Sequence, residues 1–382
     1  MASLRSSSFF LSRLTCLRTP RACSASLRRF ATASDVRGGQ PQQSQSDNHV
    51  RIVEVGPRDG LQNEKKAIPV ATKIELIERL ARTGVSVIEA GSFVSPKWVP
   101  QMENSSQILE HILTRNIPSP SPVTYSFLAP NARGVTDAMA LLQKHQGAYD
   151  TQTEAGAPTG GHGKPMVELA VFAAATETFS SKNLNCDIAT SLERFKEVIQ
   201  RAKQSGIRAR AYISVVLGCP FEGYDVDPHK VAEIATSLLE MGADEISLGD
   251  TTGMGTAPRT QELLRCMTAA GIRTEDIAMH FHDTYGQALV NTAVALERGI
   301  RTFDSSVGGL GGCPYSPGAT GNVATENVVY FMESLGMNTG IDLDAMADIG
   351  QWITAEIGKP NDSAVGKAVL GARKATANAS ST

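Results

Sequence analysis

The chain has 382 residues, of which 41% are hydrophobic and 20% charged, and its formal net charge is −3. This length and balance are typical of a globular protein with a large core and exclude a small peptide-like module. No run reaches the ~18 apolar residues that a membrane helix needs, and six cysteines without C-x-x-C spacing argue against a zinc cluster or a disulfide scaffold and suit a reducing compartment.

The N-terminal segment, residues 1–34, contains six arginines, many serines and no acidic side chain. That composition is typical of a cleavable mitochondrial transit peptide, with a disordered basic tail as the alternative. Removing these six positive charges changes the formal net charge from −3 to −9. We therefore expect an acidic mature protein without the basic surface of a nucleic-acid-binding protein. Residues 35–47, rich in Gln, Ser and Gly, predict a flexible linker.

From residue 51 onward, short apolar runs alternate with segments of helical spacing. Such alternation predicts parallel strands joined by crossover helices, and eight units over roughly 285 residues fit a closed (β/α)8 barrel. An open doubly wound sheet is the alternative. We expect the TIM-barrel catalytic domain over residues 48–337, with runs at 51–59, 85–93, 122–130, 166–176, 208–218, 244–253, 277–286 and 301–312.

Three segments depart from this alternation. Residues 146–165, rich in Gly, Thr and Pro, predict a flexible insertion. Residues 338–370 predict a further helical region that covers one end of the barrel. Residues 371–382, rich in Ala and Ser, predict a disordered tail.

Polar side chains follow the apolar runs where a barrel of this kind carries its active site, at the C-terminal ends of the strands. His280 and His282 stand two apart at a strand end, so both leave the strand on one face. Alone, this pair also fits satisfied core histidines. Because the first, seventh and eighth strands are neighbours in a closed barrel, Asp59 and Asn322 would join them. One carboxylate, one amide and two imidazoles predict an octahedral divalent cation site for Mg²⁺ or Mn²⁺.

Three charged residues beside these ligands suggest a use for the cation. The permanent charge of Arg58 suits stabilisation of a developing enolate oxygen, although a structural ion pair with Glu89 or Asp250 is the alternative. We expect Glu89 to orient Arg58 and Asp250 to fix a ligand histidine through a hydrogen bond.

Cys313 lies in the glycine-rich stretch GGLGGCPYSPGATGN, where four preceding glycines allow close approach of the backbone to a ligand. A thiol exchanges protons at mildly alkaline pH, so Cys313 is a candidate acid or base. A buried, inert thiol is the alternative.

These motifs resemble the hydroxymethylglutaryl-CoA lyase family. The resemblance covers residues 48–370 and rests on EVGPRDGLQNEK, IEAGSFVSPKWVPQM, SLGDTTGMGTAP, HFHDTYGQAL and GGLGGCPYSPGATGNVATE, which follow one another in this order. The insertion at 146–165 departs from the family's usual compact connection but contains no motif residue.

The resemblance implies a metal-dependent TIM barrel that cleaves 3-hydroxy-3-methylglutaryl-CoA to acetyl-CoA and acetoacetate, in leucine degradation and ketone-body formation. It also implies an acyl-CoA substrate, a homodimer and, with the transit peptide, the mitochondrial matrix. By motif matching, it puts Asp59, His280, His282 and Asn322 on the metal ligands. Arg58, Glu89, His280 and Cys313 fall on its catalytic positions, and Asp59 or His280 would accept the hydroxyl proton.

Other functions fit the same residues. A related barrel would condense acetyl-CoA with a 2-oxo acid or act as an aldolase on a smaller acid. A metal-dependent hydrolase would leave Arg58 without a role, and a scaffold barrel would bind metal without turnover.

Overall fold

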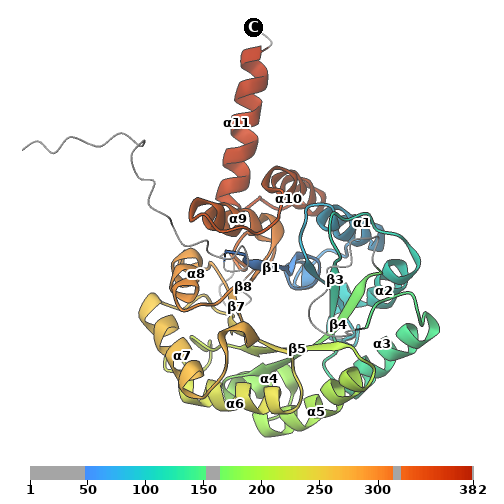
Figure 1. Ribbon diagram of the computed structural model, residues 1–382, viewed down its shortest axis with the longest axis vertical. Helices are drawn as coiled ribbons and strands as arrows, with labels where there is room; N and C mark the ends of the chain where they lie inside the picture. The colour runs from blue at the N-terminus through green and yellow to red at the C-terminus, as the bar shows by residue number, and fades with distance from the viewer. Residues whose placement is uncertain (1–47, 152–163, 313–319, 381–382) are drawn as a thin grey trace, which may run out of the picture. The chain divides into compact units, whose positions relative to one another are not determined.

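The computed structural model of the chain describes residues 48–151, 164–312 and 320–380. Its eight strands are parallel and pair in chain order, and β1 also pairs with β8, so the sheet closes into a barrel. The expected (β/α)8 barrel is confirmed and the open sheet is excluded (Figure 1). The strands are β1 (Arg51–Glu54), β2 (Val87–Ser92), β3 (Thr124–Leu128), β4 (Met166–Ala174), β5 (Arg208–Ser214), β6 (Glu245–Asp250), β7 (Ile277–Phe281) and β8 (Thr302–Ser305).

Helices follow each strand and surround the barrel in Figure 1. The connection after β4 carries two helices, α4 and α5. Most of the others carry one, and α9 is the helix that follows β8. The helices are α1 (Val70–Ala81), α2 (Ser105–Thr114), α3 (Ala132–Lys144), α4 (Glu177–Leu184), α5 (Ile188–Gln204), α6 (Pro228–Glu240), α7 (Ala257–Ala269), α8 (Ala288–Glu297), α9 (Thr325–Ser334), α10 (Leu343–Ile357) and α11 (Ala364–Ser380).

Helix α5 illustrates how the sequence determines one of these elements. The Asp187 side chain accepts a hydrogen bond from the Thr190 amide and caps the helix N-terminus. Phe195, Val198 and Ile199 recur at helical spacing, and all three are buried against the barrel. Burying each such side chain contributes roughly 1.5–3 kcal/mol to the stability of the fold, which exceeds the contribution of its intrinsic helix propensity.

The hydrophobic core lies between the strands and the surrounding helices, where most apolar side chains form one continuous cluster. The inside of the barrel is more polar. Arg210 of β5, Glu245 of β6 and Asp304 of β8 are all buried there. Their ion pairs compensate for the loss of water.

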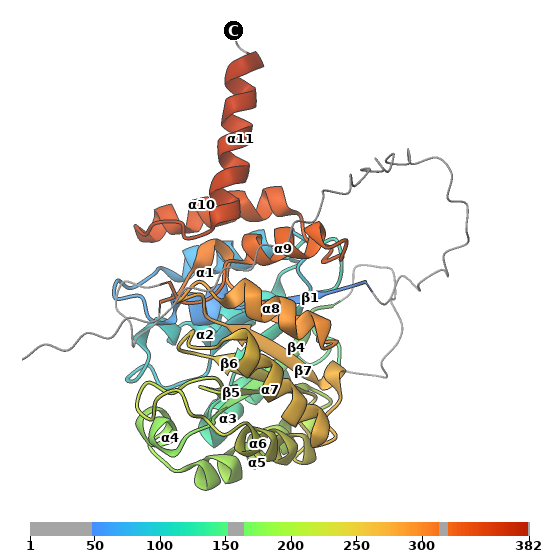
Figure 2. The same ribbon diagram turned by 90° about the vertical axis from the view of Figure 1, so that its left-hand side faces the viewer.

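The C-terminal helices α10 and α11 pack against each other and against α9 (Figure 2). Helix α11 continues through residues 371–380, where we expected a disordered tail. Alanine has the highest helix propensity, so this Ala-rich stretch extends the helix although the side chains of residues 371–379 are exposed. Across the described residues, no helix combines the length and the apolar character needed to cross a bilayer.

Several predictions concern residues that the structure does not describe. The transit peptide at 1–34, the linker at 35–47 and Cys313 lie outside the described residues. Residues 152–163 of the expected insertion do so as well. The flanks of this insertion are described, and Asp150 forms an isolated bridge with Met166 at the start of β4.

Candidate metal centre

Asp59 lies on a short π-helical turn, Gly56–Gly60, directly after β1. The Val55 carbonyl accepts hydrogen bonds from the amides of Arg58, Asp59 and Gly60, which tightens the turn and presents both charged side chains to the barrel mouth. The turn packs closely against the loop after β8, and only glycine fits at residue 60, because a Cβ there would lie 2.8 Å from the Cβ of Leu310. Turns of this kind often occur at functional sites.

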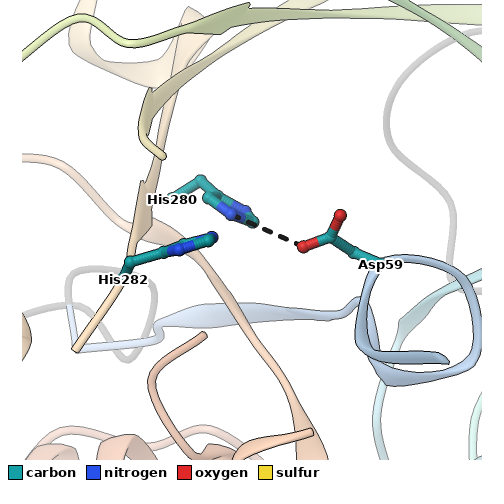
Figure 3. A group of neighbouring side chains, drawn as sticks. All are labelled: Asp59, His280 and His282. Carbon is teal, nitrogen blue, oxygen red and sulfur yellow. Dashed lines mark ion pairs between the residues drawn. The ribbon is translucent and has the colours of Figure 1, made fainter. Parts of the chain in front are cut away.

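The two histidines come from the end of β7, which β8 separates from β1 in the barrel. His280 lies in β7, and His282 lies just beyond it, where it bridges to Asn322. Figure 3 shows Asp59, His280 and His282 directed toward one another across the barrel mouth. One ligand atom from each of these three residues lies within 4.8 Å of the others. Asn322 joins them, because its Nδ2 donates a hydrogen bond to Asp59 Oδ2 at 2.9 Å.

The four side chains predicted as metal ligands therefore meet at one place, and two of their atoms lack partners. Within the described residues, His282 Nδ1 and Asn322 Oδ1 are buried and have no hydrogen-bond partner. Buried polar atoms of this kind are costly unless they bind something. A divalent cation would use such donors, so the nitrogen and oxygen atoms present here fit one.

The charges of the site also suit a cation. Burial alone would raise the pKa of Asp59, but the positive charge of Arg58, assisted by both histidines, holds it well below its usual range. Burial, with a smaller contribution from His280, lowers the pKa of His282 to about 3. The site therefore offers an ionised carboxylate and a neutral imidazole, which are the forms that bind metal.

Arg58 is enclosed by acidic side chains. Its Nη1 donates to Asp59 Oδ1 at 2.7 Å, and its Nη2 pairs with Glu89 Oε2, also at 2.7 Å. Burial opposes the charge of this guanidinium, but Glu89 and Asp59 raise the pKa of Arg58 above its ordinary value. Its carbon Cζ lies 5.6 Å from the centre of the Tyr212 ring, which sequence reasoning had not singled out. Arg58 is thus paired with Glu89 and also lies beside the candidate metal ligands.

Asp250 has a different hydrogen-bond partner from the histidine that we expected. Its Oδ2 accepts from the Gly255 amide at 2.9 Å, and burial raises its pKa to about 6. The carboxylate that contacts His280 is Asp304, whose Oδ2 lies 3.3 Å from Nδ1. Sequence reasoning missed Asp304 because it considered polar residues at strand ends, whereas Asp304 lies inside β8. The sequence feature that could have identified Asp304 is a charged residue within an otherwise apolar strand.

The fold and the site together define a TIM barrel with a candidate divalent-metal centre at the C-terminal ends of its strands. Residues 49–353 match the HMGL-like family, and the chain belongs to that family.

Its relatives include both bacterial and mitochondrial proteins. The chain is 50% identical to the 3-hydroxy-3-isohexenylglutaryl-CoA/hydroxymethylglutaryl-CoA lyase of Pseudomonas aeruginosa over 84% of this chain and 97% of that one. It is 44% identical to the mitochondrial hydroxymethylglutaryl-CoA lyase of Bos taurus over 90% of this chain and 94% of that one. A crystal structure of a hydroxymethylglutaryl-CoA lyase from Pseudomonas aeruginosa superimposes with a TM-score of 0.74 at 49% identity, covering 85% of this chain and 98% of that chain.

Proposed function

We propose that the protein is a hydroxymethylglutaryl-CoA lyase that depends on a divalent cation. It cleaves 3-hydroxy-3-methylglutaryl-CoA to acetyl-CoA and acetoacetate, a carbon–carbon lyase reaction of leucine degradation and ketone-body formation. The observation that carries this proposal is the convergence of Asp59, His280 and His282 beside Arg58, in a barrel whose relatives carry that activity. A bound Mg²⁺ or Mn²⁺ would supply Lewis acidity and a template for the substrate's oxygens.

The reaction breaks the bond between C2 and C3 of the substrate. The C3 hydroxyl loses its proton and becomes the ketone of acetoacetate, while the electron pair of the broken bond moves into the thioester as an enolate. Arg58 is positioned for this charge, because Glu89 and Asp59 hold its guanidinium at the barrel mouth. Preorganised cationic donors of this kind are often the largest contribution to such catalysis.

Two proton transfers complete the reaction. Asp59 or His280 would accept the hydroxyl proton, since both lie at the mouth and His280 Nε2 is 3.9 Å from Asp59 Oδ2. Cys313, or a water that it positions, would protonate C2 and release acetyl-CoA. The support for Cys313 is its place in the glycine-rich motif shared with the family, three residues beyond Leu310.

An acetoacetate assay on the purified mature chain, with and without EDTA, tests this function. We expect stoichiometric acetoacetate and acetyl-CoA, loss of turnover with EDTA, and recovery with Mg²⁺ or Mn²⁺. Free CoA without acetoacetate would instead indicate a hydrolase. Condensation of acetyl-CoA with a 2-oxo acid, without cleavage, would indicate a synthase.

We further infer that the protein acts as a homodimer in the mitochondrial matrix. The support for the location is the acid-free, arginine-rich composition of residues 1–34 and the likeness to mitochondrial relatives. Residues 1–34 fused to a fluorescent protein should direct it to mitochondria, and the same segment with its six arginines replaced by glutamine should not. Light scattering of the purified mature chain measures the assembly.

A further inference from the structure

The carboxylate of Asp304 is buried inside the barrel, and donors surround it. Its Oδ1 accepts from Arg210 Nη2 at 2.6 Å. Its Oδ2 accepts from Ser247 Oγ at 2.8 Å and faces His280 Nδ1 at 3.3 Å. An ionised carboxylate only accepts hydrogen bonds. The imidazole nitrogen that faces it must therefore carry the proton.

Arg210 cannot easily turn away from Asp304. This side chain is fully buried, and its Nε pairs with Glu245 Oε1 at 3.0 Å. Its Nη1 donates to the Tyr212 hydroxyl at 3.1 Å, and its Cζ lies 4.9 Å from the centre of the Tyr212 ring. Glu245 is held in turn by Arg208 at 3.3 Å. The guanidinium is fixed on three sides, so the orientation of the Asp304 carboxylate is fixed as well.

Stability alone is a weak explanation for these charges. Well-packed apolar residues often replace a buried ion pair without loss of stability. The network ends on an imidazole of the candidate metal centre, and the other nitrogen of that imidazole faces Asp59 Oδ2 at 3.9 Å. Carboxylates commonly orient metal-binding histidines in this way.

We propose that Asp304, held by Arg210, is the positioning residue that keeps His280 protonated at Nδ1, so that the lone pair on Nε2 points to the metal position. This inference rests on the proposed function, because it deepens the description of the same metal site. It assigns a purpose to the polar interior of the barrel, which the ligands alone leave unexplained. With Nδ1 protonated and Nε2 directed to the metal position, His280 would have no free nitrogen for the substrate's hydroxyl proton, so of the two proposed acceptors Asp59 would take it.

The variant Asp304→Asn tests this role with little change of shape. Arg210 donates to one side of the residue, so the amide oxygen must face Arg210 and the NH₂ group must face His280. That NH₂ group requires an acceptor at Nδ1 and moves the imidazole proton to Nε2, where it blocks the metal. Loss of such a supporting partner typically lowers metal affinity by 10–100-fold, and we expect a fall of about this size in Mn²⁺ affinity, measured by electron paramagnetic resonance.

Glu168→Gln is the matched control. Glu168 is another buried carboxylate of the barrel interior, at the far end of the same network: it pairs with Arg208 Nε at 2.8 Å, two ion pairs away from Arg210, and has no ion pair with His280 among the described residues. This variant removes a comparable buried charge and should keep the Mn²⁺ affinity of the wild type. An equal loss of affinity in both variants would mean that the network only stabilises the barrel, and would overturn the proposal.

A second measurement needs no variant that might fail to fold. In metal-free wild-type protein with ¹⁵N-labelled histidine, at alkaline pH, we expect the nitrogen chemical shifts of His280 to report protonation at Nδ1. The signals are assigned by their loss in His280→Ala. Protonation at Nε2 in the wild type, or unchanged Mn²⁺ affinity in Asp304→Asn, would overturn the positioning role alone. Wild-type protein that binds no Mn²⁺ would overturn the metal site and the proposed function together.

Discussion

Arg58 contacts two carboxylates of different kinds, and this determines what its replacement should do. Asp59 is a candidate metal ligand, whereas Glu89 is fully buried and its Oε2 pairs with Arg58. We expect Arg58→Gln to lower kcat by ~10²-fold or more, because the enolate loses its cationic partner. Mn²⁺ binding should persist, since the metal ligands stay in place. Steady-state assays and a Mn²⁺ titration measure the two effects separately.

Glu89→Gln is the informative companion variant. It keeps the guanidinium but removes the carboxylate that orients it, so we expect a smaller fall in kcat than in Arg58→Gln. Normal turnover in Arg58→Gln would remove Arg58 from the mechanism. A loss of Mn²⁺ binding in that variant would show that its main effect is on the metal site.

Two other buried glutamates predict a dependence of stability on pH. Burial raises the pKa of Glu326 to about 8 and that of Glu54 to about 7, although both accept hydrogen bonds from backbone amides. Above their ordinary pKa, the unfolded chain has lost these protons while the folded chain retains them. The free energy of unfolding therefore falls as pH rises from about 4.5 to about 8.

The variant Glu326→Gln should weaken that dependence, because a neutral amide has no proton to lose. Thermal unfolding from pH 5 to pH 9 measures it, and the melting temperature of the variant should fall less steeply than that of the wild type. Glu333→Gln, on the exposed side of the same helix α9, is the control and should retain the wild-type slope. Equal slopes for all three proteins would contradict a buried, protonated Glu326.

The candidate metal ligands could be predicted from the sequence because they lie in the C-terminal part of an apolar run or beyond it, and barrel closure brings those run ends together. Asp304 could not be found by that rule, because it lies within β8 and its importance depends on side chains from β5, β6 and β7. The local sequence around Tyr212 likewise does not predict its contacts with Arg58 and Arg210. The alternation of Arg208, Arg210 and Tyr212 along β5 does indicate one polar face of that strand.

At the scale of elements, the eight apolar runs predicted the eight strands, with the C-terminal part of each run forming a loop or turn. Helix α4 was not predicted, because its eight residues carry few apolar side chains at helical spacing. The helical end of α11 was missed for the same reason, since the Ala-rich tail lacks an apolar stripe, although its helix propensity is high. In α11, helix propensity and the apolar pattern therefore gave conflicting predictions, whereas in α4 neither of them predicted a helix.

Helix α10 approaches the loop after β8 through Gly350. A Cβ at this position would overlap Oε1 of Glu326 and lie 3.2 Å from the Cα of Gly308. We expect Gly350→Ala to lower the free energy of unfolding by roughly 1–3 kcal/mol, which is typical of overpacking. Chemical denaturation measures the change.

Gly371→Ala is the matched control in helix α11, because a Cβ there meets nothing within 4 Å. Alanine is the better helix former, so this variant should keep or slightly raise the stability. Equal stabilities for both variants would mean that α10 and the loop after β8 separate easily in solution.

In the whole molecule, the candidate metal centre lies where the barrel closes, at the pairing of its first and last strands. Asp59 follows β1, the histidines belong to the end of β7, and Asn322 follows β8, so one cation would link strands from both ends of the chain. Strands β1 and β8 pair directly over four residues, from Arg51 opposite Thr302 to Glu54 opposite Ser305. The cation would add a further link between these strands, where the barrel closes; we call this place the seam between β1 and β8. Loss of metal should therefore make the backbone of β1 and β8 more mobile before that of the strands on the opposite side of the barrel.

We expect Mn²⁺ at 100 times its dissociation constant to stabilise the folded chain by about 2.7 kcal/mol, because it binds only the folded site. The melting temperature should rise by several degrees, and hydrogen exchange should slow most in β1, β7 and β8, with little change in β3 and β4. Asp59→Asn weakens the ligand set and should remove most of both effects. A rise in melting temperature that persists in Asp59→Asn, or protection spread evenly around the barrel, would mean that Mn²⁺ stabilises the molecule from another site. In that case β1 and β8 would be joined at this seam by their backbone pairing and by side-chain hydrogen bonds such as that from Arg51 to Thr302, without help from a cation.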